Sequence, residues 1–138
     1  IPVLKTHGIS GFSFALKNHY GTFDKPGHFH GTRILQALGE LNTLAPIRDR
    51  TRLIIGDALT ICTRGWYEAV TGDSIFMSFD PVAHDAAGLK HFAEVKTAEG
   101  SNPAQAQDLG AQWLAHAAQL GLGQDKLDET DIVEVHLS

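Results

Sequence analysis

SIFMSFDPVAHDAAG, residues 74–88, is the stretch that decides the fold. Residues 74–79 form an apolar run of strand length, and the residues after Pro81 place apolar side chains at helical spacing. Asp80 and Pro81 stand between the two halves. Asp caps the free N–H groups of a helix, and Pro fits the first helical position because its missing N–H is not needed there. The stretch therefore predicts a buried strand that leads directly into a helix.

Predicted strands and predicted helices alternate on either side of this stretch. Apolar residues from Ile34 to Leu44 recur on one helical face that Pro46 closes, and Gly121 is typical of a left-handed helix cap. Trp66, Trp113 and the phenylalanines are the natural core. We predict one α/β domain over residues 1–138, a sheet of about four strands packed by helices. The predicted strands are 1–7, 52–58, 74–79 and 132–137, the helices 12–20, 32–46, 81–93 and 101–120, and the loops 21–31 and 60–73.

The first ten residues, IPVLKTHGIS, lack an initiator Met and begin as though inside a strand. We therefore expect the chain to be a portion of a larger α/β domain whose N-terminal part is missing. Such a portion would expose an apolar strand edge or face. We expect that surface to pair with a second copy of the chain and form a homodimer.

Composition narrows the classes of function. A net charge of −5 with 11 scattered Lys and Arg residues disfavours nucleic acid as a partner, because phosphate binding needs clustered cations. Cys62 is the only cysteine, which rules out an internal disulfide and an iron–sulfur cluster held by this chain alone. No apolar run is long enough for a membrane helix. We expect a cytoplasmic protein.

Polar residues gather at glycine-flanked loops, where open α/β sheets commonly bind ligands. Lys5 and His7 close the first predicted strand, and Lys17, Asn18 and His19 lie at the end of the first predicted helix, before Gly21. A lysine beside an amide donor can hold a small anionic ligand. Lys17 could equally be a solvated lysine.

Histidines suggest a second kind of site. His28 and His30 project to the same side if their loop is extended, and two imidazoles with a carboxylate form a common shell for zinc, iron or manganese. Asp57, at the end of a buried strand, is the best third ligand, and Asp80 is a further one. The alternatives are a surface role for the histidines, loop amides as the partners of Asp57, and the helix cap for Asp80.

Asp85 lies one turn beyond the cap and beside His84. It caps nothing from there, so a buried or ligand-facing role is the better interpretation. His84 could also approach Asp80, four residues earlier, either as an acid–base pair or as a local salt bridge.

The order of three motifs carries a resemblance. PVLKTH at residues 2–7, ALKNHYG at 15–21 and DPVAHDA at 80–86 together resemble the domain of unknown function 362 family. The family is similar in fold class and is often found beside ferredoxin-like modules, which implies redox or cofactor metabolism. The resemblance implies catalytic roles for Lys17, His19 and Asp85, and ligand-binding roles for Lys5, His7 and Asn18; it also singles out Asp57 and Asp80.

Two hypotheses follow. The chain is an enzyme domain that holds an anionic small molecule or a divalent metal, or it is a non-catalytic module that assembles with a redox partner. The enzyme hypothesis requires the segments around residues 7, 17–30, 57 and 80–85 to converge in space.

Overall fold

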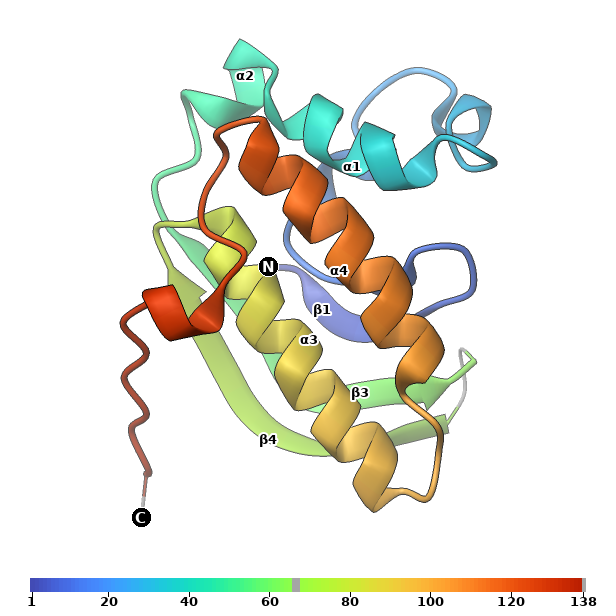
Figure 1. The fold of residues 1–138 in the computed structure, drawn as a ribbon, viewed down its shortest axis with the longest axis vertical. Helices are drawn as coiled ribbons and strands as arrows, with labels where there is room; N and C mark the ends of the chain where they lie inside the picture. Colours follow the sequence, from blue (N-terminus) through green and yellow to red (C-terminus); the bar gives the residue numbers. More distant parts are fainter. Residues whose placement is uncertain (66–67, 138) are drawn as a thin grey trace.

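A computed structural model describes residues 1–65 and 68–137. Its centre is a four-stranded mixed sheet in the order β2-β1-β3-β4 (Figure 1). β1 runs antiparallel to β2 and parallel to β3, and β3 is antiparallel to β4. The predicted α/β class is confirmed. The strands are β1 (Val3–His7), β2 (Gly11–Ser13), β3 (Ile54–Arg64) and β4 (Glu68–Ser78).

Helices α3 and α4 lie side by side over one face of the sheet, and α1 packs against α4 (Figure 1). The core lies between this helical layer and the strands. Trp113 is fully buried there, and its indole N–H donates to the Ser10 carbonyl at 3.0 Å. Trp66 lies outside the described residues. The helices are α1 (Ile34–Asn42), α2 (Ala45–Arg48), α3 (Pro81–Ala98) and α4 (Ala104–Gln119), with short 3₁₀ turns η1 (Asn18–Gly21), η2 (Pro26–His28) and η3 (Leu127–Glu129).

The Asp-Pro helix start is confirmed. One carboxylate oxygen of Asp80 accepts hydrogen bonds from the Val82 and Ala83 amides, both at 2.8 Å. The other oxygen accepts from the Gln124 amide at 2.9 Å. Asp80 therefore caps α3 and also attaches the segment after α4 to it.

The predicted cap of α4 is confirmed as well. Gly121 has a φ of +76°, its amide donates to the Ala118 carbonyl, and the Leu122 amide reaches back to Ala117. These two bonds satisfy carbonyls that the end of the helix would otherwise leave unpaired.

Residues 60–73, predicted as a loop, instead extend β3 and β4 into a long hairpin, so that prediction is wrong for its described residues. Thr60, Ile61 and Cys62 pair with Thr71, Val70 and Ala69. The sequence here is rich in β-branched residues, which fit a pleated sheet. A glycine at 72 is required because a Cβ there would collide with the Ala58 carbonyl oxygen.

Two further predictions are wrong. Residues 12–20 form β2 and then η1 rather than a helix, because Phe12, Phe14 and Leu16 also satisfy a period of two, and all three are buried. The C-terminal residues 131–137 form no strand and are exposed. Their alternating pattern suits a strand, but pairing with a neighbouring strand is what stabilises one, and no described strand pairs with them. No described helix is long and apolar enough to cross a membrane.

Candidate anion-binding site

Four of the predicted polar residues converge beside β1. Lys5 and His7 lie on this strand, Lys17 immediately precedes η1, and His30 follows η2. All four side chains are partly buried. The convergence confirms that residues 7, 17 and 30 meet in space.

The His7 ring is held by the turn between β1 and β2. Its Nδ1 accepts a hydrogen bond from the Ser10 amide at 3.2 Å, and the Ser10 hydroxyl, which donates to the Phe12 carbonyl, lies 2.8 Å from the same nitrogen. The amide N–H can only donate, so it pairs with Nδ1 when a neutral His7 carries its proton on Nε2, whereas the other tautomer donates from Nδ1 to the Ser10 hydroxyl. Either tautomer holds the ring at Nδ1 and leaves Nε2 available for a second contact.

That Nε2 points at His30. The two Nε2 atoms are 3.1 Å apart, and the rings meet edge to face with centroids 4.9 Å apart. One proton can lie between the two nitrogens, so that one ring donates and the other accepts. Burial lowers the pKa of His7 to about 4, helped by electrostatic interactions with Lys17, His30 and Lys5. His7 is thus neutral at pH 7.

Lys17 is the central cation of the cluster. Burial lowers its pKa, and the Lys5 ammonium lowers it further. Its Nζ lies 5.0 Å from the centroid of the Tyr20 ring, within the range of a cation–π contact. Among the described residues Lys17 forms no salt bridge. Its positive charge is therefore not balanced by a nearby carboxylate.

Tyr20 completes the cluster. Its ring also contacts His30, with centroids 5.6 Å apart. Burial raises the pKa of its hydroxyl, which is shielded from solvent and has no hydrogen-bond partner among the described residues. Buried polar groups normally find partners, so an unpaired hydroxyl on the ring that faces a half-buried ammonium is consistent with a site for an acceptor. The sequence places Tyr20 only within the predicted helix 12–20 and the motif ALKNHYG, and Ser10 carries no signal.

The sequence of the chain also matches the model of a known protein family. The family model described as Domain of unknown function (DUF362) matches residues 1–90, about two thirds of the chain. The chain belongs to the domain of unknown function 362 family. No curated protein and no solved structure matches the chain significantly. The part that matches the family contains β1 to β4, the first half of α3 and every residue of the cationic cluster.

Asp85, also within the part that matches the family, lies in the interior and is fully buried. Its two carboxylate oxygens accept hydrogen bonds from the Ala15 and Leu16 amides, each at 2.9 Å. His84 Nδ1 lies 2.8 Å from one of them, so His84 pairs with Asp85 rather than with Asp80. Burial raises the pKa of Asp85, and these hydrogen bonds oppose the rise. Asp85 fixes the backbone immediately before Lys17 and so positions the cation.

The other predicted residues of this family member lie apart from the cluster. Asp57, opposite Val3 in the sheet, accepts from the Leu59 amide at 3.0 Å, and Asp80 caps α3. His28 packs against Phe29 in the exposed loop. Within residues 1–65 and 68–137, no three His, Cys, Asp or Glu side chains form a group that could hold a metal ion. The predicted set of His28, His30, Asp57 and Asp80 is thus not brought together.

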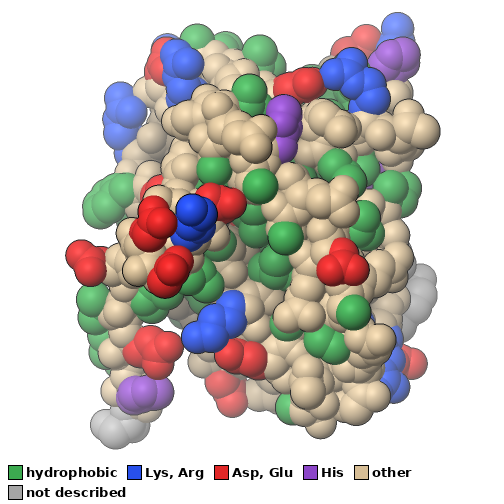
Figure 2. Space-filling model, in the orientation of Figure 1, with side chains coloured by type: hydrophobic (Ala, Val, Ile, Leu, Met, Phe, Trp, Pro, Cys, Tyr) green, Lys and Arg blue, Asp and Glu red, His purple; other side chains and the backbone are tan. Residues whose placement is uncertain are grey.

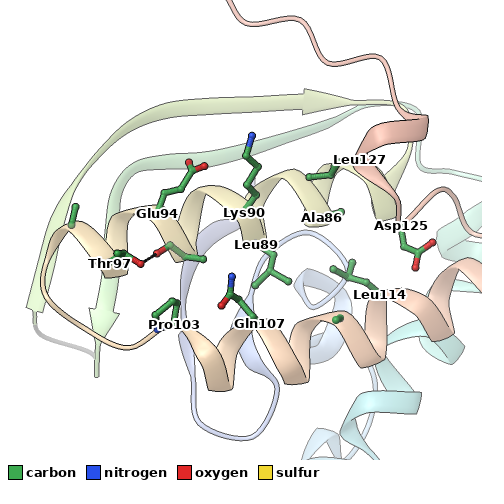
Figure 3. A pocket seen from close by; sticks show the side chains of 13 residues that line it. Ala86, Leu89, Lys90, Glu94, Thr97, Pro103, Gln107, Leu114, Asp125 and Leu127 are labelled. Carbon is green, nitrogen blue, oxygen red and sulfur yellow. Dashed lines mark hydrogen bonds between the residues drawn. The ribbon is translucent and has the colours of Figure 1, made fainter.

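Two hollows are present on the surface of the described residues, a pocket and a groove. Asn18 and His19 line a pocket of about 650 Å³ together with Arg50 and Arg52. A groove of about 810 Å³ runs between α3 and α4, and Leu89 and Leu114 line it (Figure 3). On the side of the molecule seen in Figure 2, acidic and lysine side chains are interspersed over α3 and the C-terminal segment. The groove contains none of the predicted site residues, the smaller pocket contains Asn18 and His19, and neither hollow is lined by Lys5, His7, Lys17, Tyr20 or His30. The candidate site therefore rests on the charges and contacts within the cationic cluster.

Proposed function

We propose that this chain binds a small anionic ligand, a carboxylate or a phosphate, at the cluster of Lys5, His7, Lys17, Tyr20 and His30. The observation that carries the proposal is the half-buried Lys17 ammonium over the ring of Tyr20, whose buried hydroxyl is unpaired among the described residues. An anion there would offset the repulsion between the lysines and accept a hydrogen bond from the hydroxyl. The association of the family with ferredoxin-like modules leads us to expect a ligand from redox or cofactor metabolism.

The geometry favours an anion because, in the free protein, the charged form of Lys17 is destabilised. Burial and the neighbouring lysine both lower the pKa of Lys17, which means that both oppose its charged form. A bound anion reverses both effects, since it lies close to the ammonium and replaces lost solvation. Charge-assisted hydrogen bonds of this kind are about twice as strong as neutral ones.

Chemical steps beyond binding would involve the histidine pair. The facing Nε2 atoms of His7 and His30 can share one proton, at the edge of the same cluster. A ligand held by Lys17 could exchange a proton with this pair. The enzyme hypothesis therefore assigns acid–base work to His7 and His30 and charge stabilisation to Lys17.

Calorimetric titration with inorganic phosphate and with succinate tests the proposal. We expect the native chain to bind at least one of them, and Lys17→Met to weaken that binding by about tenfold or more, because Met keeps the length of the side chain but not its charge. Lys25→Met is the matched control, since the Lys25 side chain is 82% exposed and pairs with Asp24.

Thermal unfolding gives a second readout that a general loss of stability would not mimic. Without ligand, Lys17→Met should melt at or above the native temperature, because it removes a charge that burial opposes. With phosphate or succinate, only the native chain and Lys25→Met should gain stability. Equal gains in Lys17→Met, or no binding of either anion to the native chain, would refute the proposal.

A further inference from the structure

The smaller of the two hollows, the pocket of about 650 Å³, carries three arginines. It lies where the end of α2, the start of β3 and the turn after α4 meet (Figure 1). Arg48, Arg50 and Arg52 line it, and all three are exposed. Among the described residues that line the pocket, none is Asp or Glu. The charge that the pocket presents to a ligand is therefore positive.

Two of these arginines have no carboxylate partner. Arg48 Nε donates to the Asp49 carboxylate at 2.8 Å. Arg50 and Arg52, by contrast, form no salt bridge within residues 1–65 and 68–137. A phosphate monoester carries a charge of about −1.5 to −2 at pH 7, which the two guanidinium groups together match. Guanidinium groups also bind phosphate oxygens with paired hydrogen bonds.

The segment that carries Arg50 and Arg52 is anchored at both ends. In the last turn of α2, the Ile47 carbonyl accepts from the Thr51 amide at 3.0 Å and from the Thr51 hydroxyl at 2.8 Å. Ile54 then enters β3, which is paired with β4. The backbone is therefore held at the pocket before any ligand arrives, and this reduces the conformational entropy that binding would cost.

The rest of the pocket wall is largely apolar. Ile54, Ile55 and Leu122 line it, and Ile54 is buried. Phe79, directly after β4, also lines the pocket and is 83% exposed, so its ring is open to contact with a planar group. Pockets of about 300–1,000 Å³ take molecules of cofactor size. The wall therefore suits a ligand that has an apolar, planar body in addition to its charged group.

Polar groups on the wall are suited to the edge of such a body. Asn42 is buried and lines the pocket. Its Nδ2 donates to the Leu16 carbonyl at 2.7 Å and to the Leu38 carbonyl at 2.8 Å, which uses both amide protons. What Asn42 can offer a ligand is its carbonyl oxygen, an acceptor. Asn18 and His19, two of the predicted site residues, add an amide and an imidazole to the same wall.

We propose that this pocket is a second ligand site and that it takes a phosphate monoester joined to an aromatic heterocycle, a molecule of the mononucleotide class. Arg50 and Arg52 hold the phosphate, the apolar wall covers the ring, and Asn42 accepts a hydrogen bond from an N–H at the edge of the ring. None of the five residues of the cationic cluster lines this pocket. The two sites can therefore be tested separately.

Calorimetric titration of the full chain with adenosine monophosphate (AMP), adenosine and inorganic phosphate tests the proposal. We expect AMP to bind at least about tenfold more tightly than either of its parts. Adenosine lacks the charge, and inorganic phosphate lacks the ring, without which exposed ion pairs to arginine contribute little. The titrations are repeated with Lys17→Met, which removes the central cation of the cationic cluster. The preference for AMP should persist in this variant.

A pair of arginine variants identifies what holds the phosphate. Arg52→Gln should weaken the binding of AMP by about tenfold and leave adenosine unaffected, because it removes one charged partner of the phosphate. Arg33→Gln is the matched control: Arg33 is exposed, pairs with Glu40 at 3.0 Å and does not line the pocket. Melting curves check that both variants are folded. Two-dimensional amide spectra by nuclear magnetic resonance locate the ligand, since AMP should shift the Ile54 amide and leave that of Val135 unchanged.

Three outcomes would overturn the proposal. AMP could bind no more tightly than inorganic phosphate, which would mean that the wall makes no contribution. Arg52→Gln and Arg33→Gln could weaken binding equally, as expected from net charge alone. Finally, Lys17→Met could abolish the binding of AMP while Arg52→Gln retains it. The anion would then lie in the cationic cluster, and the proposed function would stand without this pocket. Loss in Arg52→Gln with full binding in Lys17→Met supports the pocket, even if the cluster binds no anion.

Discussion

His7 and His30 meet edge to face with their Nε2 atoms 3.1 Å apart, although 23 residues separate them in the sequence. The contact joins the end of β1 to the loop after η2. Burial and electrostatic interactions with Lys17, His30 and Lys5 lower the pKa of His7 to about 4, so the neutral ring makes this contact at pH 7.

The stability of the fold should therefore depend on pH through His7. The pKa of His7 falls from 6.5 in the unfolded chain to about 4 in the fold, so the unfolded state takes up this proton first. Stability from this residue is present above pH 6.5 and is lost as the pH falls toward 4. The effect is at most about 3 kcal/mol, and less after solvent screening of a half-buried ring.

Urea unfolding of the native chain and of His7→Gln between pH 4 and 7 measures this dependence. Gln can accept from Ser10 and donate to His30 without titrating, so the slope between pH 6.5 and 4 should become shallower. His136→Gln, in the exposed C-terminal segment, should retain the native slope. An unchanged slope in His7→Gln would show that the lowered pKa of His7 is not the source of the pH dependence.

Asp85→Asn should destabilise the protein strongly. The carboxylate accepts from two amides and from His84 in a fully buried setting, whereas an Asn amide group would direct its own N–H at one of these donors. We expect a loss of about 3 kcal/mol in the free energy of unfolding. The same variant should weaken anion binding in the fraction that remains folded, because the backbone before Lys17 loses its anchor.

Denaturant titration with calorimetry on the same samples checks both effects. Asp57→Asn is a suitable comparison, because Asp57 accepts only from the nearby Leu59 amide among the described residues and is partly exposed. If Asp85→Asn were as stable as the native chain, the negative charge of the buried carboxylate would make no contribution to the free energy of unfolding.

The fold and part of the site could be predicted from the sequence where local chemistry decides the structure. Asp80 and Pro81 define a helix start in any context, and Gly121 defines a helix end. Lys5, His7 and Lys17 lie in motifs that the family resemblance marks, and they do converge. Residues close by in the sequence are enough to determine these features.

The remaining features depend on neighbours far along the chain. Tyr20 matters because Lys17 and His30 approach its ring, and Ser10 because it holds the His7 ring at Nδ1; neither effect has a local signature. The alternation at residues 132–137 is that of a strand, but a strand also needs a partner edge. Asp57 and His28 have the right chemistry for a metal ligand, yet the sheet register and the loop after η1 keep them apart.

Gly56→Ala should be among the most damaging small substitutions. A Cβ at this position of β3 would overlap the ring of Phe14 and the imidazole of His84, both of which are buried. Rearranging them would disturb the pair of His84 with Asp85, so we expect a loss of about 2–3 kcal/mol in unfolding free energy. Gly27→Ala, where a Cβ would meet nothing within 4 Å, is the control and should unfold near the native midpoint. Equal midpoints for both variants would argue against this packing.

Asp80→Ala separates the role of this residue as a helix cap from the predicted role as a metal ligand. The alanine leaves the Val82, Ala83 and Gln124 amides without their acceptor, so the free energy of unfolding should fall by about 1–2 kcal/mol in buffer containing a chelator. Asp80→Asn should lose less, since its carbonyl oxygen can still accept from α3. Urea midpoints of the three proteins, with and without added zinc or manganese, provide the comparison. A loss in Asp80→Ala that appears only when metal is present would contradict the capping role and favour coordination instead.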